Sequence, residues 1–136
     1  MKIVRLKDLE GTDQEVKSPA GWTSVRFLLA KDGMGFSFHE TTFPPGLEFD
    51  MWYKHHLEAV YCYKGKGELT NRDTGEKFTI EPGTLYALDK HDKHTLKAIE
   101  ELKLVCAFNP PVTGREIHDE EGAYILNPQD AIEPQD

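Results

Sequence analysis

The spacing of turn-forming residues constrains the fold of this chain more than any other feature of its sequence. Clusters of Gly, Pro, Asp and Asn recur at short, regular intervals between residues 31 and 111, and such clusters favour turns. The intervals are too short for helices of ordinary length, and the apolar residues between them mostly alternate with polar ones. An all-β fold is therefore predicted, and short, evenly spaced strands are typical of a closed barrel or jelly roll. Strands are expected at residues 25–30, 35–43, 57–63, 67–72, 77–80, 84–88, 95–99 and 102–108.

The length of 136 residues fits one domain. Residues 1–126 are expected to form that domain, because no repeat or linker interrupts them. The polar, Pro-containing segment 127–136 is expected to be a flexible C-terminal tail.

Charge and cysteine content narrow the class of protein. Sixteen basic and twenty-four acidic residues give a net charge of −8, and the lysines and arginines are not clustered as nucleic-acid binding requires. No nucleic-acid partner is expected. The N-terminal segment is charged and the sequence has no long apolar stretch. Neither a signal peptide nor a membrane span is therefore expected. Cys62 and Cys106 lie within apolar, strand-like runs, which favours reduced thiols and a cytoplasmic location.

Alternation along the strands predicts which side chains share the interior, because alternate residues point to one face. Leu104, Cys106 and Phe108 form one inward set. The same rule places the carboxyl group of Glu58 and the phenol of Tyr86 on otherwise apolar inward faces. Three further residues share a parity: Trp22, Ser24 and Arg26.

One segment resembles the first motif of the cupins, which reads glycine, five residues, histidine, one residue, histidine, three or four residues, glutamate, six residues, glycine. Gly46, Glu58 and Gly65 keep this frame. Trp52 and Lys54 occupy the positions of the two histidine ligands, so the usual site of three histidines and one glutamate is excluded.

A later segment partly resembles the second cupin motif. Gly83 and His94 match its first glycine and its histidine. Asp89, His91 and Ala98 replace the proline, the second glycine and the asparagine. Together the two segments predict a small single-domain cupin barrel of the jelly-roll type.

The motif residues that remain as metal ligands are Glu58 and His94. Two ligands rarely hold a divalent ion, so a third inward oxygen or nitrogen is needed. Tyr86 is the best candidate, because a phenolate is a hard ligand that suits iron. Spacing alone leaves open the alternative that Tyr86 is a core tyrosine whose hydroxyl bonds to a neighbour.

The remaining histidines are not required as ligands. His55 and His56 fall in the loop between motif residues, where solvent exposure is expected. His91 is expected to help form the turn before His94.

Four stretches resemble one particular family, the ectoine synthases: GMGFSFHETT, YKHHLEAVYC, GTLYALDKHDKH and LVCAFNPPVTGREIHDEEGAY. The resemblance covers the chain from about Trp22 to Tyr124 and implies a metal-dependent, homodimeric cupin. It also implies a hydro-lyase reaction, the cyclisation of N4-acetyl-L-2,4-diaminobutanoate to ectoine with loss of water. The implied metal is one divalent ion, Fe(II), and its implied ligands are Glu58, Tyr86 and His94. These donor types also suit zinc or manganese, so the residues alone leave the metal open.

The resemblance further implies a set of residues that contact the substrate: Trp22, Ser24, Thr41, Tyr53, Cys106, Phe108, Glu116 and His118. Arg26 joins this set as a bidentate partner for the substrate carboxylate, with an exposed salt bridge as the alternative.

Within that set, the catalytic residues are predicted to be Glu116, His118, Tyr53 and Cys106. Glu116 and His118 lie two apart and would supply base and acid in turn; the alternative is that their segment is a solvated, charged lid. Cys106 is interpreted as a packed thiol that tunes polarity and not as a nucleophile, because no adjacent base is evident.

Trp52 and His56 depart from the pattern of the family, which predicts a different shape at the mouth of the site. Two other functions compete with cyclisation. One is another cupin enzyme, such as an iron-dependent dioxygenase or a sugar isomerase; the loss of both motif histidines argues against the usual dioxygenase site. The other is a cupin that only binds a small solute, which would gain little from Glu58, Tyr86 and His94 together.

Overall fold

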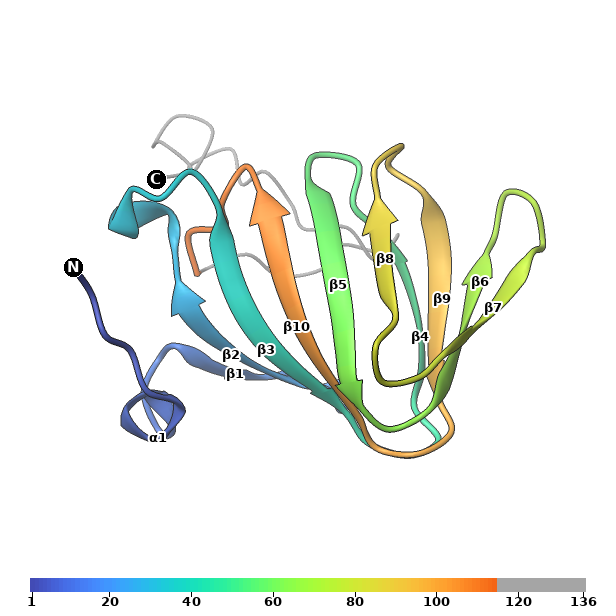
Figure 1. The fold of residues 1–136 in the computed structure, drawn as a ribbon, viewed down its shortest axis with the longest axis horizontal. Helices are drawn as coiled ribbons and strands as arrows, with labels where there is room; N and C mark the ends of the chain where they lie inside the picture. The colour runs from blue at the N-terminus through green and yellow to red at the C-terminus, as the bar shows by residue number, and fades with distance from the viewer. Residues whose placement is uncertain (115–136) are drawn as a thin grey trace.

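The computed structural model describes residues 1–114, which are almost entirely β-structure (Figure 1). The helical elements are short: α1 (Leu6–Leu9) and the 3-10 turn η1 (Ala30–Asp32). The ten strands are β1 (Glu15–Lys17), β2 (Thr23–Leu28), β3 (Ser37–Phe43), β4 (Glu48–Trp52), β5 (Leu57–Lys64), β6 (Gly67–Asn71), β7 (Lys77–Ile80), β8 (Leu85–Leu88), β9 (Lys93–Ala98) and β10 (Leu102–Asn109).

The strands form two antiparallel sheets that enclose a common interior (Figure 1). One sheet has six strands in the order β1-β2-β3-β10-β5-β8, and the other has four in the order β4-β9-β6-β7. Strands that are distant in sequence therefore become neighbours, as where β10 lies between β3 and β5. This arrangement confirms the predicted all-β, jelly-roll fold.

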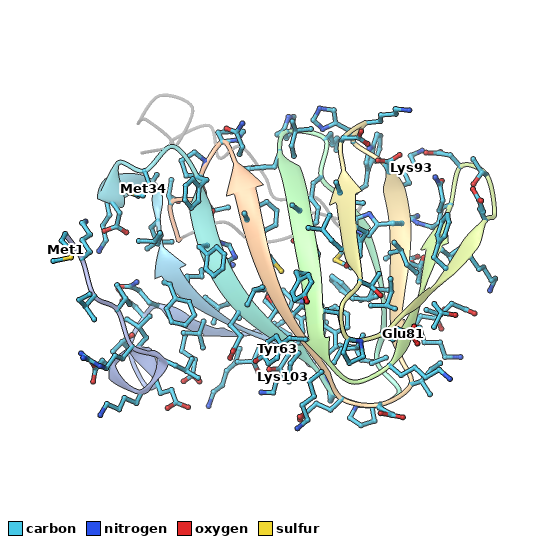
Figure 2. The ribbon with its side chains drawn as sticks, viewed as in Figure 1. Met1, Met34, Tyr63, Glu81, Lys93 and Lys103 are labelled. Atoms are coloured by element: carbon cyan, nitrogen blue, oxygen red, sulfur yellow. The ribbon has the colours of Figure 1, made fainter. Side chains whose placement is uncertain are left out.

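Alternating side chains of both sheets fill the space between them (Figure 2). In β10, Leu104, Cys106 and Phe108 are buried, whereas the residues between them are partly exposed. This confirms the predicted parity of the last strand. Leu96 and Ile80, from the four-stranded sheet, are buried in the same core.

The sequence did not predict two strands, β1 and β4, or the single helical turn α1. In β4, Phe49 and Met51 turn toward the core while Glu48 and Asp50 are exposed. Acidic residues are uncommon in strands, and here they are tolerated because β4 is an edge strand with one solvated face. The eight predicted strands are present, with ends that differ by up to two residues.

Two different structural requirements explain the glycines of the cupin-like frame: a positive φ angle and close packing. Gly46, Gly65 and Gly83 all have positive φ angles, which favour glycine. Only Gly65 is also sterically confined, since a Cβ atom there would lie 1.9 Å from the backbone oxygen of Glu101. Gly65 therefore allows the β5–β6 turn to pack directly against the start of β10.

Within residues 1–114, no helix is long and apolar enough to cross a membrane. The predicted tail at 127–136 lies outside the described residues. The division of the chain into a domain and a tail stays a prediction.

Candidate active site

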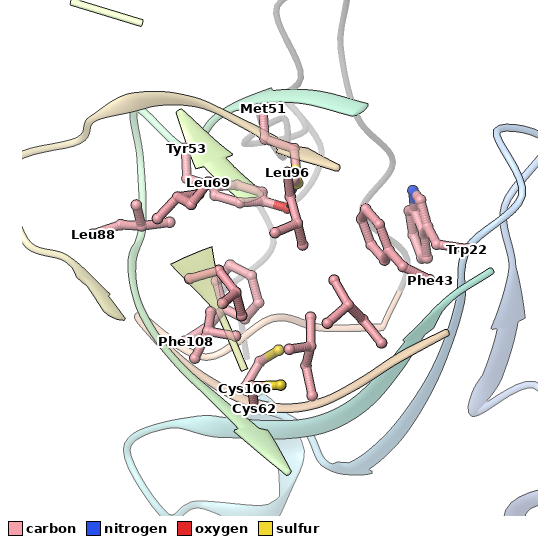
Figure 3. Close-up of a cluster of buried hydrophobic side chains, with 14 of the residues drawn as sticks. Trp22, Phe43, Met51, Tyr53, Cys62, Leu69, Leu88, Leu96, Cys106 and Phe108 are labelled. Carbon is pink, nitrogen blue, oxygen red and sulfur yellow. Dashed lines mark hydrogen bonds between the residues drawn. The ribbon is translucent and has the colours of Figure 1, made fainter. Parts of the chain in front are cut away.

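A small inner cavity of about 30 Å³ lies between the sheets, and most of the predicted substrate contacts line it. Figure 3 shows the side chains of four of them, Trp22, Tyr53, Cys106 and Phe108, within the buried core. Six predicted site residues line it: Trp22, Thr41, Tyr53, Glu58, Cys106 and Phe108. They come from segments spread over much of the chain, which the two sheets bring together. Its walls are mainly apolar, with a few polar groups among them; the lining, but not the volume, is typical of sites for small molecules.

Aromatic rings order one wall of this cavity. The rings of Tyr53 and Phe108 meet edge to face, with centroids 5.1 Å apart. Tyr53 also lies 5.9 Å from the ring of His94. Tyr53 therefore connects the predicted substrate wall with a predicted metal ligand.

Glu58 projects from β5 into this interior and is buried. Burial raises the pKa of its carboxyl group to about 8, against a smaller lowering effect of a hydrogen bond from Cys106. Burial also raises the pKa of Tyr86, and the charge of Glu58 contributes to that shift. The carboxyl group and the phenol thus lie close enough to interact electrostatically, in agreement with the pairing of β5 and β8.

His94 projects from β9 in the opposite sheet and is 1% exposed. Its Nδ1 atom lies 2.9 Å from the backbone oxygen of Asp92, so Nδ1 donates the hydrogen bond. Burial lowers the pKa of His94. The ring is therefore neutral, with a lone pair on Nε2, and this buried atom has no hydrogen-bond partner among residues 1–114. A backbone acceptor on one ring nitrogen and a free lone pair on the other is the arrangement of a metal-binding histidine.

Tyr86 and His94 line a second, larger cavity of about 380 Å³. Glu58 lines the inner cavity instead. No group of three or more His, Cys, Asp or Glu side chains that could hold a metal occurs in the described part of the chain. A metal site built there needs another kind of third donor, and the Tyr86 phenol is the predicted one. A carboxylate, a phenolate and an imidazole together suit a divalent transition-metal ion.

The Cys106 thiol is buried and free, and its Sγ atom lies 3.8 Å from Oγ1 of Thr41. Burial raises the pKa of this thiol well above its ordinary value. A protonated, packed thiol is a poor nucleophile. These contacts agree with the interpretation of Cys106 as a packing residue.

Arg26 is 1% exposed on β2, so the alternative of an exposed salt bridge is wrong. Ser24 is also buried, and Trp22 packs edge to face against Phe49 with a centroid distance of 6.4 Å. The shared inward parity of Trp22, Ser24 and Arg26 is thus confirmed.

Two histidines were not expected in the interior. His56 is 0% exposed, and its ring meets Phe108 edge to face at 5.8 Å. The expectation that His56 is solvated is wrong, because the loop before β5 turns this side chain inward; His55 is exposed as expected. His39, on β3, lines the inner cavity. The sequence could have indicated this position, because His39 and Thr41 are two apart in a predicted strand and therefore share a face.

The two positions that hold histidine ligands in other cupins serve a different purpose here. The Nζ atoms of Lys54 and Lys93 lie 4.9 and 4.4 Å from the ring centroid of Trp52. Trp52 and Lys54 therefore contact each other. His91 has a φ of 53° and a ring nitrogen 2.8 Å from the backbone oxygen of Tyr53, which confirms its predicted role in the turn.

Glu116 and His118, the predicted base and acid, lie outside the described residues. Their roles stay predictions.

Comparison with known families places this geometry in context. The family model described as "Ectoine synthase" matches residues 1–128. The chain belongs to the ectoine synthase family. The expected resemblance is thereby confirmed.

Individual ectoine synthases are similar over nearly their whole length. The L-ectoine synthase of Desulfatibacillum aliphaticivorans is 61% identical over 125 residues, which cover 91% of this chain and 96% of that protein. The crystal structure of the ectoine synthase from P. lautus has a TM-score of 0.83 and 46% identity, covering 94% of this chain and 92% of the other.

A more distant structure supports the fold alone. An RmlC-like cupin from Shewanella frigidimarina has a TM-score of 0.66 with 13% identity, covering 81% of this chain and 91% of the other. The cupin architecture is therefore shared beyond the ectoine synthases.

Proposed function

We propose that this protein is an L-ectoine synthase, a hydro-lyase that closes N4-acetyl-L-2,4-diaminobutanoate into ectoine with loss of water. The observation that carries the proposal is 61% identity to a relative with that name over 91% of the chain. The burial of Glu58, His94 and the Tyr53–Phe108 wall in one interior supports it. The product is a compatible solute, so the protein would serve in the response to osmotic stress.

Glu58, Tyr86 and His94 would hold one divalent metal ion, which we propose to be Fe(II). The buried, unpartnered Nε2 atom of His94 and the proximity of Glu58 to Tyr86 support this ligand set. When bound, the ion would supply Lewis-acid stabilisation of negative charge on the acetyl oxygen.

The apolar walls of the site would hold the substrate in a folded conformation. Trp22, Tyr53 and Phe108 present rings to the inner cavity or beside it, and these rings would exclude water from the reacting atoms. Holding the α-amine near the acetyl carbon would lower the entropic cost of ring closure, because most conformers of the open chain keep the two groups apart. Arg26, buried on β2, would bind the substrate carboxylate.

Ring closure also needs proton transfers. The α-amine must lose a proton before it attacks, and the hydroxyl group that leaves must gain one. We assign these steps to Glu116 and His118, which stand two apart in the sequence. Tyr53 completes the proposed catalytic set, and Cys106 would adjust the polarity beside Glu58 without forming a covalent intermediate.

Two further properties belong to this proposal. The active form would be a homodimer, which analytical ultracentrifugation can test: a monomer at micromolar concentration would contradict it. The location would be the cytoplasm, where the free thiols of Cys62 and Cys106 would stay reduced.

The direct test is an assay of iron-loaded protein with N4-acetyl-L-2,4-diaminobutanoate, in which ectoine is followed by chromatography. Chelated protein and the Glu58→Gln variant are run in parallel. Glu58→Gln keeps the size of the side chain and removes the anionic ligand, so ectoine formation is expected to fall by at least about 100-fold.

The outcomes separate the candidate functions. Ectoine formed by the iron-loaded wild type alone would support both the reaction and the ligand set. Full activity after chelation would contradict the metal. No turnover by folded, metal-loaded protein that still binds ectoine would favour a solute-binding cupin.

A further inference from the structure

His39 is a buried residue of the inner cavity to which the proposed mechanism gives no role. It lies on β3, is 1% exposed and lines the cavity together with Tyr53 and Glu58. One ring nitrogen, Nε2, lies 3.1 Å from Oγ of Ser37. The other nitrogen, Nδ1, has no hydrogen-bond partner among residues 1–114 and remains for a ligand.

The surroundings of Ser37 decide which nitrogen of His39 carries the proton. Ser37 is 0% exposed, and its Oγ accepts a hydrogen bond of 3.0 Å from the backbone N–H of Val112. The hydroxyl proton of Ser37 still needs an acceptor, because a buried donor without one is costly. Within the described residues the only acceptor at hydrogen-bond distance is Nε2 of His39. Ser37 therefore donates to Nε2, and the proton of the neutral ring sits on Nδ1.

The charge state of His39 follows from its neighbours. Burial lowers the pKa of His39 well below its ordinary value, and the charges of Arg26 and His56 lower it further. Arg26 stands directly opposite His39 in the pairing of β2 and β3. The ring is therefore a neutral donor beside a cation, so the two groups can approach the same anion without repelling each other.

We propose that Ser37 is a positioning residue that holds His39 in the Nδ1–H tautomer, and that this N–H and the Arg26 guanidinium together bind the carboxylate of the ligand. The proposal rests on the proposed function, since it takes the ligand to be an amino-acid derivative. The Arg26 guanidinium would attract the carboxylate by its positive charge, and the His39 N–H would orient the carboxylate by a hydrogen bond.

The tautomer can be measured on the full chain without any ligand. Proton–nitrogen correlation spectra of the imidazole rings distinguish the two neutral tautomers, and His39→Asn assigns the signal by its loss. The wild type is expected to show the proton on Nδ1. In Ser37→Ala the ring loses this hydrogen bond, and a mixture of tautomers is expected. A wild-type ring with its proton on Nε2 would overturn the proposal.

Two variants of His39 separate its two nitrogens. The amide of Asn reaches the position of Nδ1 and can still donate to the ligand, whereas the amide of Gln reaches the position of Nε2 and keeps only the contact with Ser37. By titration calorimetry of iron-loaded protein, His39→Gln is expected to bind ectoine about tenfold or more weakly than His39→Asn. Equal affinities for ectoine would contradict a ligand contact through Nδ1.

A ligand without the carboxylate tests what His39 recognises. The cyclic amidine that lacks the carboxylate of ectoine is expected to bind both variants equally. Weaker binding of this amidine to His39→Gln would show that His39 contacts the ring and not the carboxylate.

These measurements fail separately from the proposed function. If the wild type makes no ectoine, the reaction is wrong whatever the tautomer. If the wild type makes ectoine but its tautomer is Nε2–H, only the role of Ser37 and His39 is wrong.

Discussion

Arg26, His39 and Glu58 are polar or charged, and all three are buried in the same interior. Removal from water disfavours the charged form of a titratable group. It raises the pKa of Glu58 to about 8 and lowers that of His39. Burial thus favours the protonated carboxyl group of Glu58 at neutral pH, where the residue type alone would predict an ionised one.

The depressed pKa of His39 predicts a dependence of stability on pH. The unfolded chain takes up a proton near pH 6.5, whereas the folded chain resists it, so this contribution to stability is present above pH 6.5 and is lost as the pH falls. Between pH 7 and pH 5 the free energy of unfolding is expected to drop by up to about 2 kcal/mol through His39. Urea unfolding at both pH values measures the change.

The comparison that isolates this effect is His39→Asn, which cannot titrate. Arg26 on β2 and His56 before β5 face His39, and Glu58 lines the same cavity, so these groups remain in both proteins. The variant is expected to lose less stability than the wild type between the two pH values. Equal losses would show that His39 is not the titrating group.

At the scale of elements, the β5–β6 turn depends on Gly65 through both its φ angle and its packing. Gly65 and Gly83 have nearly equal φ angles of 93° and 94°. A Cβ atom at Gly83 would meet nothing within 4 Å, but one at Gly65 would collide with the backbone of Glu101. Gly65→Ala is therefore expected to destabilise the protein by at least about 2 kcal/mol more than Gly83→Ala.

Chemical denaturation of the two alanine variants measures this difference, with Gly83→Ala as the matched control. Because φ is the same, any excess cost at Gly65 reports steric contact with the start of β10. Equal destabilisation would mean that the turn moves away from Glu101 at little cost.

At the scale of the whole molecule, the proposed metal ligands come from both sheets. Glu58 and Tyr86 belong to β5 and β8 of the six-stranded sheet, and His94 belongs to β9 of the four-stranded sheet. A bound ion would therefore connect the sheets and stabilise only the folded state. At a free metal concentration of about 100 times Kd, this linkage is worth about 2.7 kcal/mol.

Chelation is accordingly expected to lower Tm by several degrees, and added Fe(II) under anaerobic conditions should restore it. Differential scanning calorimetry with and without metal measures the shift. Glu58→Gln should show little response to metal. If neither chelator nor iron changes the Tm of the wild type, the result would argue against a metal site that spans the sheets.

Local pattern in the chain was enough to define most of the strands and the faces they bury. Turn residues and alternation are local signals, so the predicted strand 77–80 coincides with β7, and the inward parity of Cys106 and Phe108 holds. The motif frame also indicated Glu58 and His94 from residue types and spacing alone. β4 escaped prediction because its acidic residues are acceptable only at a sheet edge, and edges are not encoded locally.

The burial and the hydrogen-bond partners of the site residues were decided only by the assembly of the two sheets. His56, which was expected to be solvent-exposed, is buried against Phe108 of β10, and Arg26 is buried on β2 opposite His39 of β3. The proposed tautomer of His39 depends on Ser37, and through it on Val112, which lies 75 residues away from Ser37 along the chain. Burial and hydrogen-bond partners arise only when both sheets assemble, and for this reason local pattern predicts the fold better than the chemistry of the site.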